Sequence, residues 1–184
     1  FYQSDGTLLS AQQAEELVDI YHQGEFRRVH WQEYRKVITD RTALQTHLEK
    51  VIKFVDLEQI RRAKFKVAID CCNGAGAVLT PLLLKEFGCE VTAINDIPDG
   101  RFPRNPEPIP ENLTVLGELV RNSQADVGFA QDADADRLAI VNEHGEPIGE
   151  EYTLSLAAEF VLSHHPAGAV VTNLSTTQAV DDIA

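Results

Sequence analysis

The stretch Phe65-Lys66-Val67-Ala68-Ile69-Asp70-Cys71-Cys72-Asn73-Gly74-Ala75-Gly76 decides the fold of this chain. Its first six residues are rich in apolar and β-branched side chains, which is typical of a buried strand. The asparagine and the two glycines that follow predict a turn. The apolar run at 78–87, closed by Gly88, then predicts a helix. A strand, a glycine turn and a helix in this order indicate a layered α/β domain.

The residues after this stretch predict the rest of that domain. We expect a helix opened by Pro110 as its first residue and running to about residue 120, because proline is favoured at that position. A loop between the last two strands, at 131–137, would join them as a hairpin-like excursion. The predicted fold class is therefore α/β, with a layered mixed sheet and helices over about 63–147. Strands are expected after the first one at 89–94, 125–130 and 138–141.

The residues before the domain predict helices. A capping box of Ser10 and Gln13 indicates a helix over 10–24. Apolar residues at three- and four-residue spacing over 34–55 predict a second helix, and Asp56 is placed to cap a short third one. After the domain, we expect a helix at 150–163, a strand at 169–172 and a helix that begins with Ser175 as its N-cap. A helical segment thus precedes the sheet, and a further unit begins after it.

Composition and charge exclude several classes of protein. No apolar run approaches the roughly 18–20 residues that a membrane helix needs, so we expect no membrane insertion. The chain holds 16 basic and 29 acidic residues, a net charge of −13, which repels nucleic acid and anionic lipid. Its three cysteines fit no disulfide framework, and Cys71 and Cys72 are adjacent. We therefore expect buried thiols in a reducing cytoplasm.

The segment Gln131-Asp132-Ala133-Asp134-Ala135-Asp136-Arg137 is the most informative for function. In an extended strand, its three aspartates would span about 13 Å at about 3.3 Å per residue, which is too far for one ion. The loop must therefore curl to bind a metal, and the small alanines permit this. A bound Mg²⁺ would relieve the repulsion between the carboxylates. Arg137 would then lie where it can contact a phosphate oxygen beside the metal.

Other interpretations of these motifs remain open. The acidic segment has the spacing of an EF-hand but lacks its glycine, and it can also be a solvated acidic turn. Gly74 and Gly76 resemble a dinucleotide fingerprint without its third glycine, which favours a packing turn. Arg101 and Arg104 lie in a proline-rich loop and can be simply solvated. The sequence at 163–166, Ser-His-His-Pro, favours a capped helix end over a nucleophile with its base.

Three motifs lie in order along the chain. They are residues 67–76, the loop Pro98-Asp99-Gly100-Arg101-Phe102-Pro103 with Pro106-Glu107-Pro108 and Pro110-Glu111-Asn112-Leu113, and the acidic segment 132–137. In these motifs the chain resembles the α-D-phosphohexomutases. This family includes phosphoglucomutase, phosphomannomutase and phosphoglucosamine mutase. The resemblance covers nearly the whole chain. It implies that 1–33 end a first domain, that 34–147 form a second domain, and that 148–184 begin a third, so that the chain is a piece of a longer protein.

The resemblance also implies a reaction. Members of the family transfer phosphate reversibly between C1 and C6 of a hexose phosphate, through a phosphoserine and a bisphosphorylated sugar. By analogy, Asp132, Asp134 and Asp136 would hold Mg²⁺, and Arg137 would contact the phosphate. Many members have glycine at positions 133 and 135, so the loop can be equally tight here only if neither alanine needs a positive φ.

The serine loop of the family has no counterpart in these residues, and neither do the loops that recognise the sugar and its second phosphate. The resemblance therefore implies that the isolated chain is inactive and that the rest of the parent protein supplies the nucleophile. A non-catalytic module that binds a divalent metal, or an interaction domain derived from the family, is the alternative. Neither the particular hexose nor the oligomeric state follows from the sequence.

Overall fold

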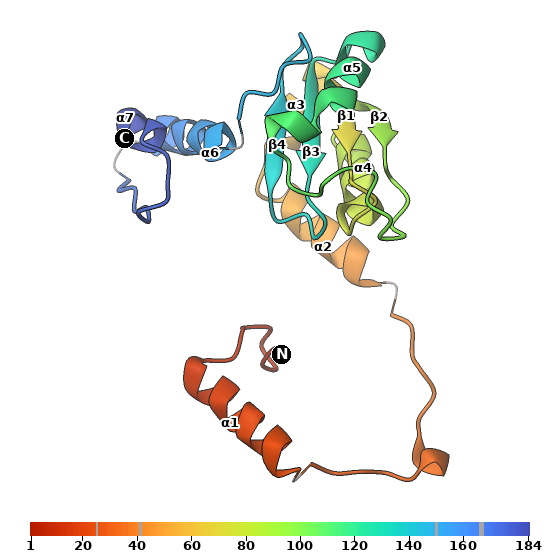
Figure 1. The fold of residues 1–184 in the computed structure, drawn as a ribbon. Helices are drawn as coiled ribbons and strands as arrows, with labels where there is room; N and C mark the ends of the chain where they lie inside the picture. Colours follow the sequence, from red (N-terminus) through yellow and green to blue (C-terminus); the bar gives the residue numbers. More distant parts are fainter. Residues whose placement is uncertain (25, 41, 150, 166–167) are drawn as a thin grey trace. The chain divides into compact units, whose positions relative to one another are not determined.

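A computed structural model describes residues 1–24, 26–40, 42–149, 151–165 and 168–184. The chain forms two compact units, residues 1–40 and residues 41–184, and each is described by itself. The second unit contains the sheet (Figure 1). Across the described residues, no helix combines the length and the apolar character that crossing a bilayer requires.

The second unit is built on a mixed sheet of four strands in the order β2-β1-β3-β4. β1 runs parallel to both β2 and β3, whereas β4 is antiparallel to β3. The predicted α/β class with a mixed sheet is confirmed, and so is the hairpin between the last two strands. The strands are β1 (Lys66–Asp70), β2 (Glu90–Ile94), β3 (Val127–Gln131) and β4 (Leu138–Val141).

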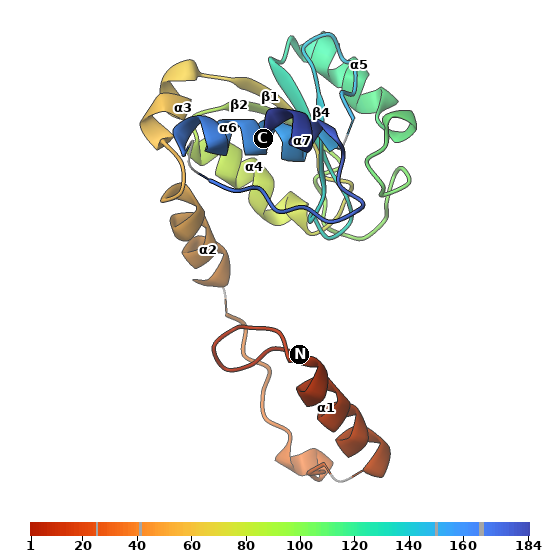
Figure 2. The ribbon, with the colours of Figure 1, turned by 90° about the vertical axis from the view of Figure 1, so that its left-hand side faces the viewer.

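Helices cover both faces of this sheet (Figure 2). Side chains alternate along a strand, so Val67 and Ile69 of β1 pack on the side of α4 (Gly76–Glu86). Ala68 packs in the opposite layer with α5 (Thr114–Ser123). The core between α5 and the sheet includes Leu113, Leu116 and Val120, all at most 1% exposed. Each such side chain contributes about 1.5–3 kcal/mol by burial, which holds the strand ends in place for the loops that follow them.

The helix predicted to begin at Pro110 begins later. Pro110–Asn112 form a single 3₁₀ turn, in which the Leu113 amide donates to the Pro110 carbonyl at 3.1 Å. Leu113 has φ −108° and ψ 11°, outside the helical region, and α5 starts only at Thr114. A 3₁₀ turn is common at a helix N-terminus, and Leu113 still lies three residues before the buried Leu116, so the tightened turn keeps this apolar anchor in the core.

Within the second unit, two helices precede the sheet. They are α2 (Thr42–Ile52) and α3 (Leu57–Ala63). Asp56 caps α3 as expected, since its Oδ1 accepts from the Gln59 amide at 2.9 Å. The helix expected over 34–55 is wrong at 34–40, where the described backbone is not helical. Val37 and Ile38 are 94% and 91% exposed. A β-branched run has low helix propensity, and here it buries no apolar face that would offset that cost.

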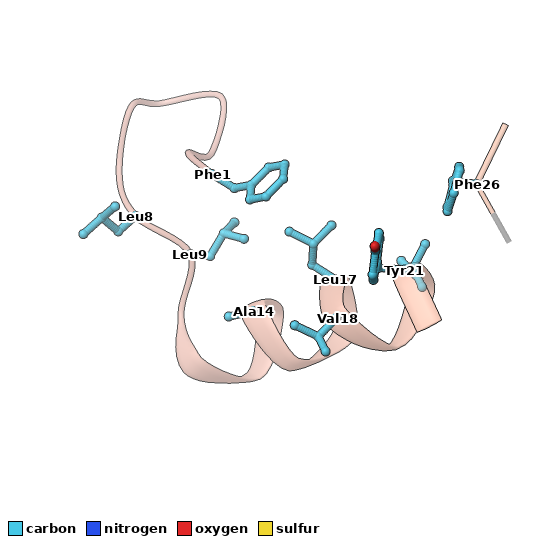
Figure 3. A pocket seen from close by; sticks show the side chains of 9 residues that line it. Phe1, Leu8, Leu9, Ala14, Leu17, Val18, Tyr21 and Phe26 are labelled. Atoms are coloured by element: carbon cyan, nitrogen blue, oxygen red, sulfur yellow. The ribbon is translucent and has the colours of Figure 1, made fainter. Parts of the chain in front are cut away.

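The first unit contains α1 (Ala11–Gln23), and its predicted capping box is present. Ser10 Oγ accepts from the Gln13 amide at 3.3 Å, and the Ser10 amide donates to Gln13 Oε1 at 2.9 Å. A short 3₁₀ turn follows at Trp31–Glu33. One face of α1 borders an apolar groove of about 600 Å³ (Figure 3). Its lining includes Phe1, Leu9, Leu17, Tyr21 and Phe26.

The end of the chain contains α6 (Glu151–His164) and α7 (Ala179–Ile183). Thr153 Oγ1 of α6 donates to the Leu138 carbonyl of β4 at 2.6 Å. The strand expected at 169–172 is wrong, because these residues are not paired in any strand of the described chain. Ser175 is not an N-cap either. Its amide donates to Asn173 Oδ1 at 2.9 Å, and the side chain of Asn173 thus stabilises a turn that delays the helix. Position 150, predicted as a helix start, lies outside the described residues.

The two adjacent cysteines are buried where β1 ends, as expected. Cys71 and Cys72 are both 0% exposed, whereas Cys89 is partly exposed, and all three are free thiols. Burial raises the pKa of the Cys71 thiol to about 12, helped by the negative charges of Asp70 and Asp96. Burial also raises the pKa of Cys72. Because the thiolate is the reactive form, these two residues should be inert in the folded chain.

We predict that a chromogenic disulfide reagent at about pH 8 labels Cys89 first. Burial raises the pKa of this thiol as well, but it is partly exposed whereas the other two are buried. Cys71 and Cys72 should react at the rate of unfolding, and all three should react at once in denaturant. The Cys89→Ala variant is the control, and it should remove the fast phase completely. Rapid labelling of two or three thiols in native conditions would contradict the burial of the turn after β1.

Candidate functional site

The site lies at the edge of the sheet where the parallel strands end. β1 lies between β2 and β3, and Asp70 of β1 is paired in register with Ala130 of β3. The chain forms β2 on one side of β1 and then β3 on the other side, so the strand order reverses its direction at β1. Such a reversal leaves a crevice beyond the carboxyl ends of the strands, where α/β proteins bind ligands. Two segments meet there: the glycine turn, residues 71–76, after β1, and the acidic loop, residues 131–137, after β3.

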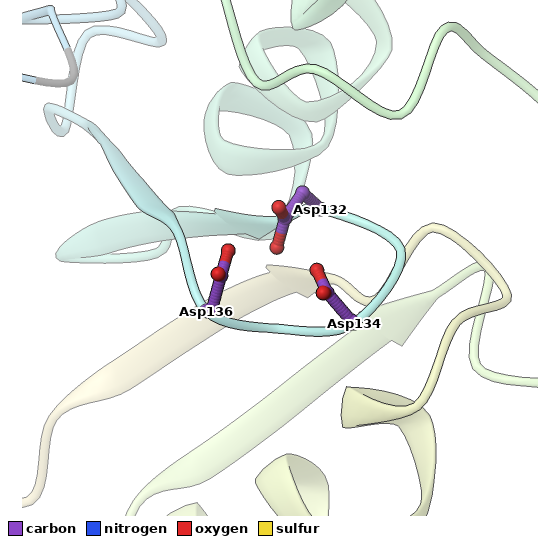
Figure 4. Close-up of side chains that lie close together, drawn as sticks. All are labelled: Asp132, Asp134 and Asp136. Atoms are coloured by element: carbon purple, nitrogen blue, oxygen red, sulfur yellow. The ribbon is translucent and has the colours of Figure 1, made fainter. Parts of the chain in front are cut away.

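The acidic loop brings its three aspartates together (Figure 4). Carboxylate oxygens of Asp132, Asp134 and Asp136 lie within 4.8 Å of one another. Opposite ligands of an octahedral Mg²⁺ are separated by about 4.2 Å, given bonds of about 2.1 Å, so the three carboxylates fit such an ion after small side-chain rotations. Asp132 is 3% exposed, and the other two are exposed. The loop thus curls as a metal site requires.

The glycine turn holds the middle of the acidic loop. The Ala75 amide donates to the Ala133 carbonyl at 2.9 Å. A Cβ on Gly74 would lie 2.3 Å from that same carbonyl oxygen, so no other residue fits without moving the loop. The two glycines therefore allow the glycine turn to pack closely on the acidic loop. The packing turn favoured in the sequence analysis, where a third glycine was missing, is confirmed.

Ala135 adopts the left-handed conformation, with φ 64°. The sequence suggested that the loop would be tight only without a positive φ at either alanine, and the structure corrects this. The loop is tight and does use the left-handed region at Ala135, whereas Ala133 is not among the positive-φ residues. A residue with a Cβ is strained there. This strain is the cost of the curl that brings Asp134 and Asp136 together.

Arg137 is bound to the acids that precede it. Its amide donates to Asp132 Oδ1 at 3.2 Å, and its Nε donates to Asp132 Oδ2 at 3.0 Å. Its Nη1 donates to Glu107 Oε1 at 3.2 Å. The side chain of Arg137 is 46% exposed. Glu107, which the sequence analysis placed in a motif without giving it a role, is thus a neighbour of the site.

The charges of the three acids are coupled. Burial acts to raise the pKa of Asp132, but hydrogen bonds from the Arg137 amide and side chain outweigh it, so that pKa lies below its usual value. The pKa of Asp136 is raised by its hydrogen bond to Asp132 and by the charges of Asp134 and Asp132. Without a cation, the cluster thus resists carrying all three negative charges.

Arg104 corrects the sequence analysis, which allowed it to be simply solvated. Its side chain is 10% exposed, and its Nε donates to Asp70 Oδ2 at 2.7 Å. Its Nη2 donates to the Gln131 carbonyl at 2.7 Å. No local pattern marks this residue as buried, because its partners belong to β1 and β3. Arg101, in contrast, has an 89% exposed side chain.

The Ser-His pair near residue 164 closes a helix end. Ser163 Oγ donates to the Phe160 carbonyl at 2.7 Å, and His164 Nδ1 lies 2.8 Å from the same oxygen. These contacts satisfy a carbonyl in the last turn of α6. Both residues are exposed, and neither is among the residues that converge at the acidic loop.

The fold and the acidic loop define a layered α/β domain with a candidate metal site, and a comparison with known proteins shows its family. Residues 45–145 match the model of the family described as phosphoglucomutase/phosphomannomutase, alpha/beta/alpha domain II. The chain therefore belongs to the phosphoglucomutase/phosphomannomutase family, the α-D-phosphohexomutases. The resemblance seen in its motifs is confirmed.

Relatives of this family match along the chain. A "Probable phosphoglucosamine mutase" of Methanopyrus kandleri is 38% identical over 184 residues, which is all of this chain and 40% of the relative. A phosphoglucomutase/phosphomannomutase of Thermococcus kodakarensis is 38% identical over 167 residues, 90% of this chain and 36% of the relative. The crystal structure of a family protein from Burkholderia thailandensis aligns with a TM-score of 0.67 at 26% identity, covering 95% of this chain and 38% of that one. The chain thus spans about two fifths of its curated relatives.

We predict that Ala135→Gly stabilises the chain, whereas Ala133→Gly destabilises it. Relieving the left-handed strain at Ala135 gains about 1–2 kcal/mol, from which the greater freedom of glycine in the unfolded chain subtracts about 0.4–1 kcal/mol. The net rise in the free energy of unfolding lies between about 0 and 1.6 kcal/mol, and the middle of these ranges gives about 0.8 kcal/mol. Ala133 is not in the left-handed region, so glycine there relieves no strain. It only increases the freedom of the unfolded chain and lowers the free energy of unfolding. Urea unfolding of both variants checks this, and changes of the same sign would contradict the strain at Ala135.

Proposed function

We propose that this chain is part of a phosphohexomutase, in which it supplies the loop that binds Mg²⁺. The parent would transfer phosphate reversibly between C1 and C6 of a hexose phosphate, through a phosphoserine and a bisphosphorylated sugar. Membership of the family supports this proposal, together with relatives described as phosphoglucosamine mutase and phosphoglucomutase/phosphomannomutase. A relative described as phosphopentomutase, 36% identical, shows that the sugar can differ among similar sequences.

The observation that carries the proposal is the convergence of three carboxylates within 4.8 Å, with Arg137 directly after them. We assign Asp132, Asp134 and Asp136 as the ligands of Mg²⁺. When bound, the ion supplies positive charge that offsets the charge of a transferring phosphoryl group. The Arg137 guanidinium supplies further positive charge and fixed N–H donors for phosphate oxygens.

The Nη2 group of the Arg137 guanidinium supports a role in phosphate binding. Its Nε and Nη1 are held by Asp132 and Glu107, and no hydrogen bond within the described part of the chain engages Nη2. Arg137 and Asp136 also line a cavity of about 700 Å³, which Thr153, Asn173 and Thr176 border with polar side chains. A phosphate bound at Arg137 would therefore have space beside it. The hydroxyls of Thr153 and Thr176 already donate within the chain, and Glu151 also lines this cavity.

The proposal includes the organisation of the chain. We propose that residues 1–33 end a first domain, 34–147 form the second and 148–184 begin the third. Residues 45–145, which match the family description of domain II, support the middle assignment. We also propose that the chain alone is inactive, because the phosphoserine of the family is not among its matched motifs. The free thiols accord with a reducing cytoplasm.

A titration with Mn²⁺ or Mg²⁺ tests the metal assignment. We predict that the amide signals of residues 131–137 broaden or shift first, and that Asp134→Asn abolishes this response. Affinity should be weak, because only three protein ligands are present for an ion that prefers six. Glu118→Gln, which removes an exposed acid on α5, is the matched control and should respond like the unaltered chain. Equal broadening at all acidic residues would show a solvated acidic turn, and a purely structural or interaction role would then replace the proposal.

The role of Arg137 is tested in the full parent protein. We predict that Arg137→Ala lowers kcat by about 10²-fold, the usual effect of losing one charge-stabilising donor, while the circular dichroism spectrum stays unchanged. Arg101→Ala, which removes an exposed arginine near the same edge, is the control and should retain full turnover. Normal turnover by the Arg137→Ala variant would show that Arg137 is an ordinary surface charge with no role in the reaction.

A further inference from the structure

The Arg104 guanidinium makes four hydrogen bonds beside the acidic loop. Its Nη1 donates to the carbonyls of Asn105 and Pro106 at 3.0 and 2.9 Å. Its Nε binds Asp70, and its Nη2 binds the carbonyl of Gln131. One buried guanidinium therefore joins the end of β1, the end of β3 and the proline-rich loop. A planar guanidinium presents donors in several fixed directions, which makes this possible.

These contacts reach both ends of the acidic loop. Gln131 is the last residue of β3 and directly precedes Asp132, so Arg104 fixes the point where the loop begins. The carbonyls of Asn105 and Pro106 fix the backbone just before Glu107, and the Asn112 amide group donates to the Glu107 carbonyl at 2.8 Å. Glu107 in turn binds Arg137, the last residue of the loop. The loop is thus held at its start directly and at its end through Glu107.

We propose that Arg104 is a positioning residue of the metal loop, which keeps the three carboxylates converged before an ion binds. The inference rests on the proposed function, because it assumes that the converged loop is the metal site. Nothing in the geometry brings Arg104 into contact with the three carboxylates themselves, so it acts through Gln131 and Glu107. Partners that orient metal ligands in this way typically change metal affinity by about 10–100-fold when they are removed.

Arg104→Lys is the informative variant. Lysine retains a positive charge for Asp70, but its compact ammonium cannot also reach the carbonyls on both sides. We expect Mn²⁺ affinity at the loop to fall by about tenfold. In the metal-free chain, we expect faster hydrogen exchange at the amides of 132–137, with exchange in β1 and β2 unchanged. Arg101→Lys, an exposed position in the same proline-rich loop, should change neither quantity.

A second variant decides the matter if Arg104→Lys does not fold. The double substitution Asp70→Asn with Arg104→Met removes both charges together, so that no buried charge is left unpaired. It also removes the donor to Gln131. We expect the folded double variant to show the same loss of Mn²⁺ affinity and the same faster exchange in the acidic loop.

Three results decide between this inference and the proposed function. If a fully folded Arg104 variant, single or double, keeps the Mn²⁺ affinity and the loop exchange of the unaltered chain, Arg104 has only a structural role and the inference is overturned. If the unaltered chain binds no Mn²⁺ at the loop, the metal assignment fails and the inference fails with it as a statement about a metal site. Unchanged exchange in the metal-free variants would overturn the positioning role whatever the metal does.

Discussion

The buried ion pair of Asp70 and Arg104 is the interaction on which the site depends. The side chains are 3% and 10% exposed, and taking two charges out of water is costly unless every hydrogen bond is made. Here every polar side-chain atom of the pair is hydrogen-bonded, because Asp70 Oδ1 also accepts from the Cys72 amide and from Asn95 Nδ2 at 2.9 Å. Since apolar residues can often replace such pairs without loss of stability, we interpret this pair as setting geometry: it ties the ends of three strands to one loop.

The acidic loop is shaped by close packing as well as by charge. The glycine turn approaches it so closely that a Cβ at Gly74 would overlap the Ala133 carbonyl, and the backbone of Ala135 is strained. Strained residues concentrate at functional sites, where the surrounding structure maintains them. Packing from the turn, the anchor at Gln131 and the ion pair of Glu107 with Arg137 together bring three like charges into one place. The same arrangement makes a cation the natural complement of the site.

Two errors of the sequence analysis share one cause. Apolar residues at 34–40 have helical spacing, and the residues at 169–172 have the composition of a strand, yet neither segment adopts that structure. Their side chains are largely exposed, with Val37 at 94% and Val171 at 92%. A short helix or strand gains most of its stability from the surface it packs against or the strand it pairs with. A local pattern therefore predicts an element only where the tertiary structure supplies that partner.

The amino-acid sequence by itself determined the strands, the glycine turn, most helices and the three aspartates with Arg137. These features repeat with the periods of local structure or stand side by side in the chain, so they can be recognised without knowing the fold. Only the tertiary structure decided the roles of Arg104 and Glu107 and the left-handed backbone at Ala135. Arg104 meets Asp70 and Gln131 across 34 and 27 residues of sequence, and Glu107 meets Arg137 across 30. Contacts over such distances depend on the order of strands in the sheet, which no local pattern encodes.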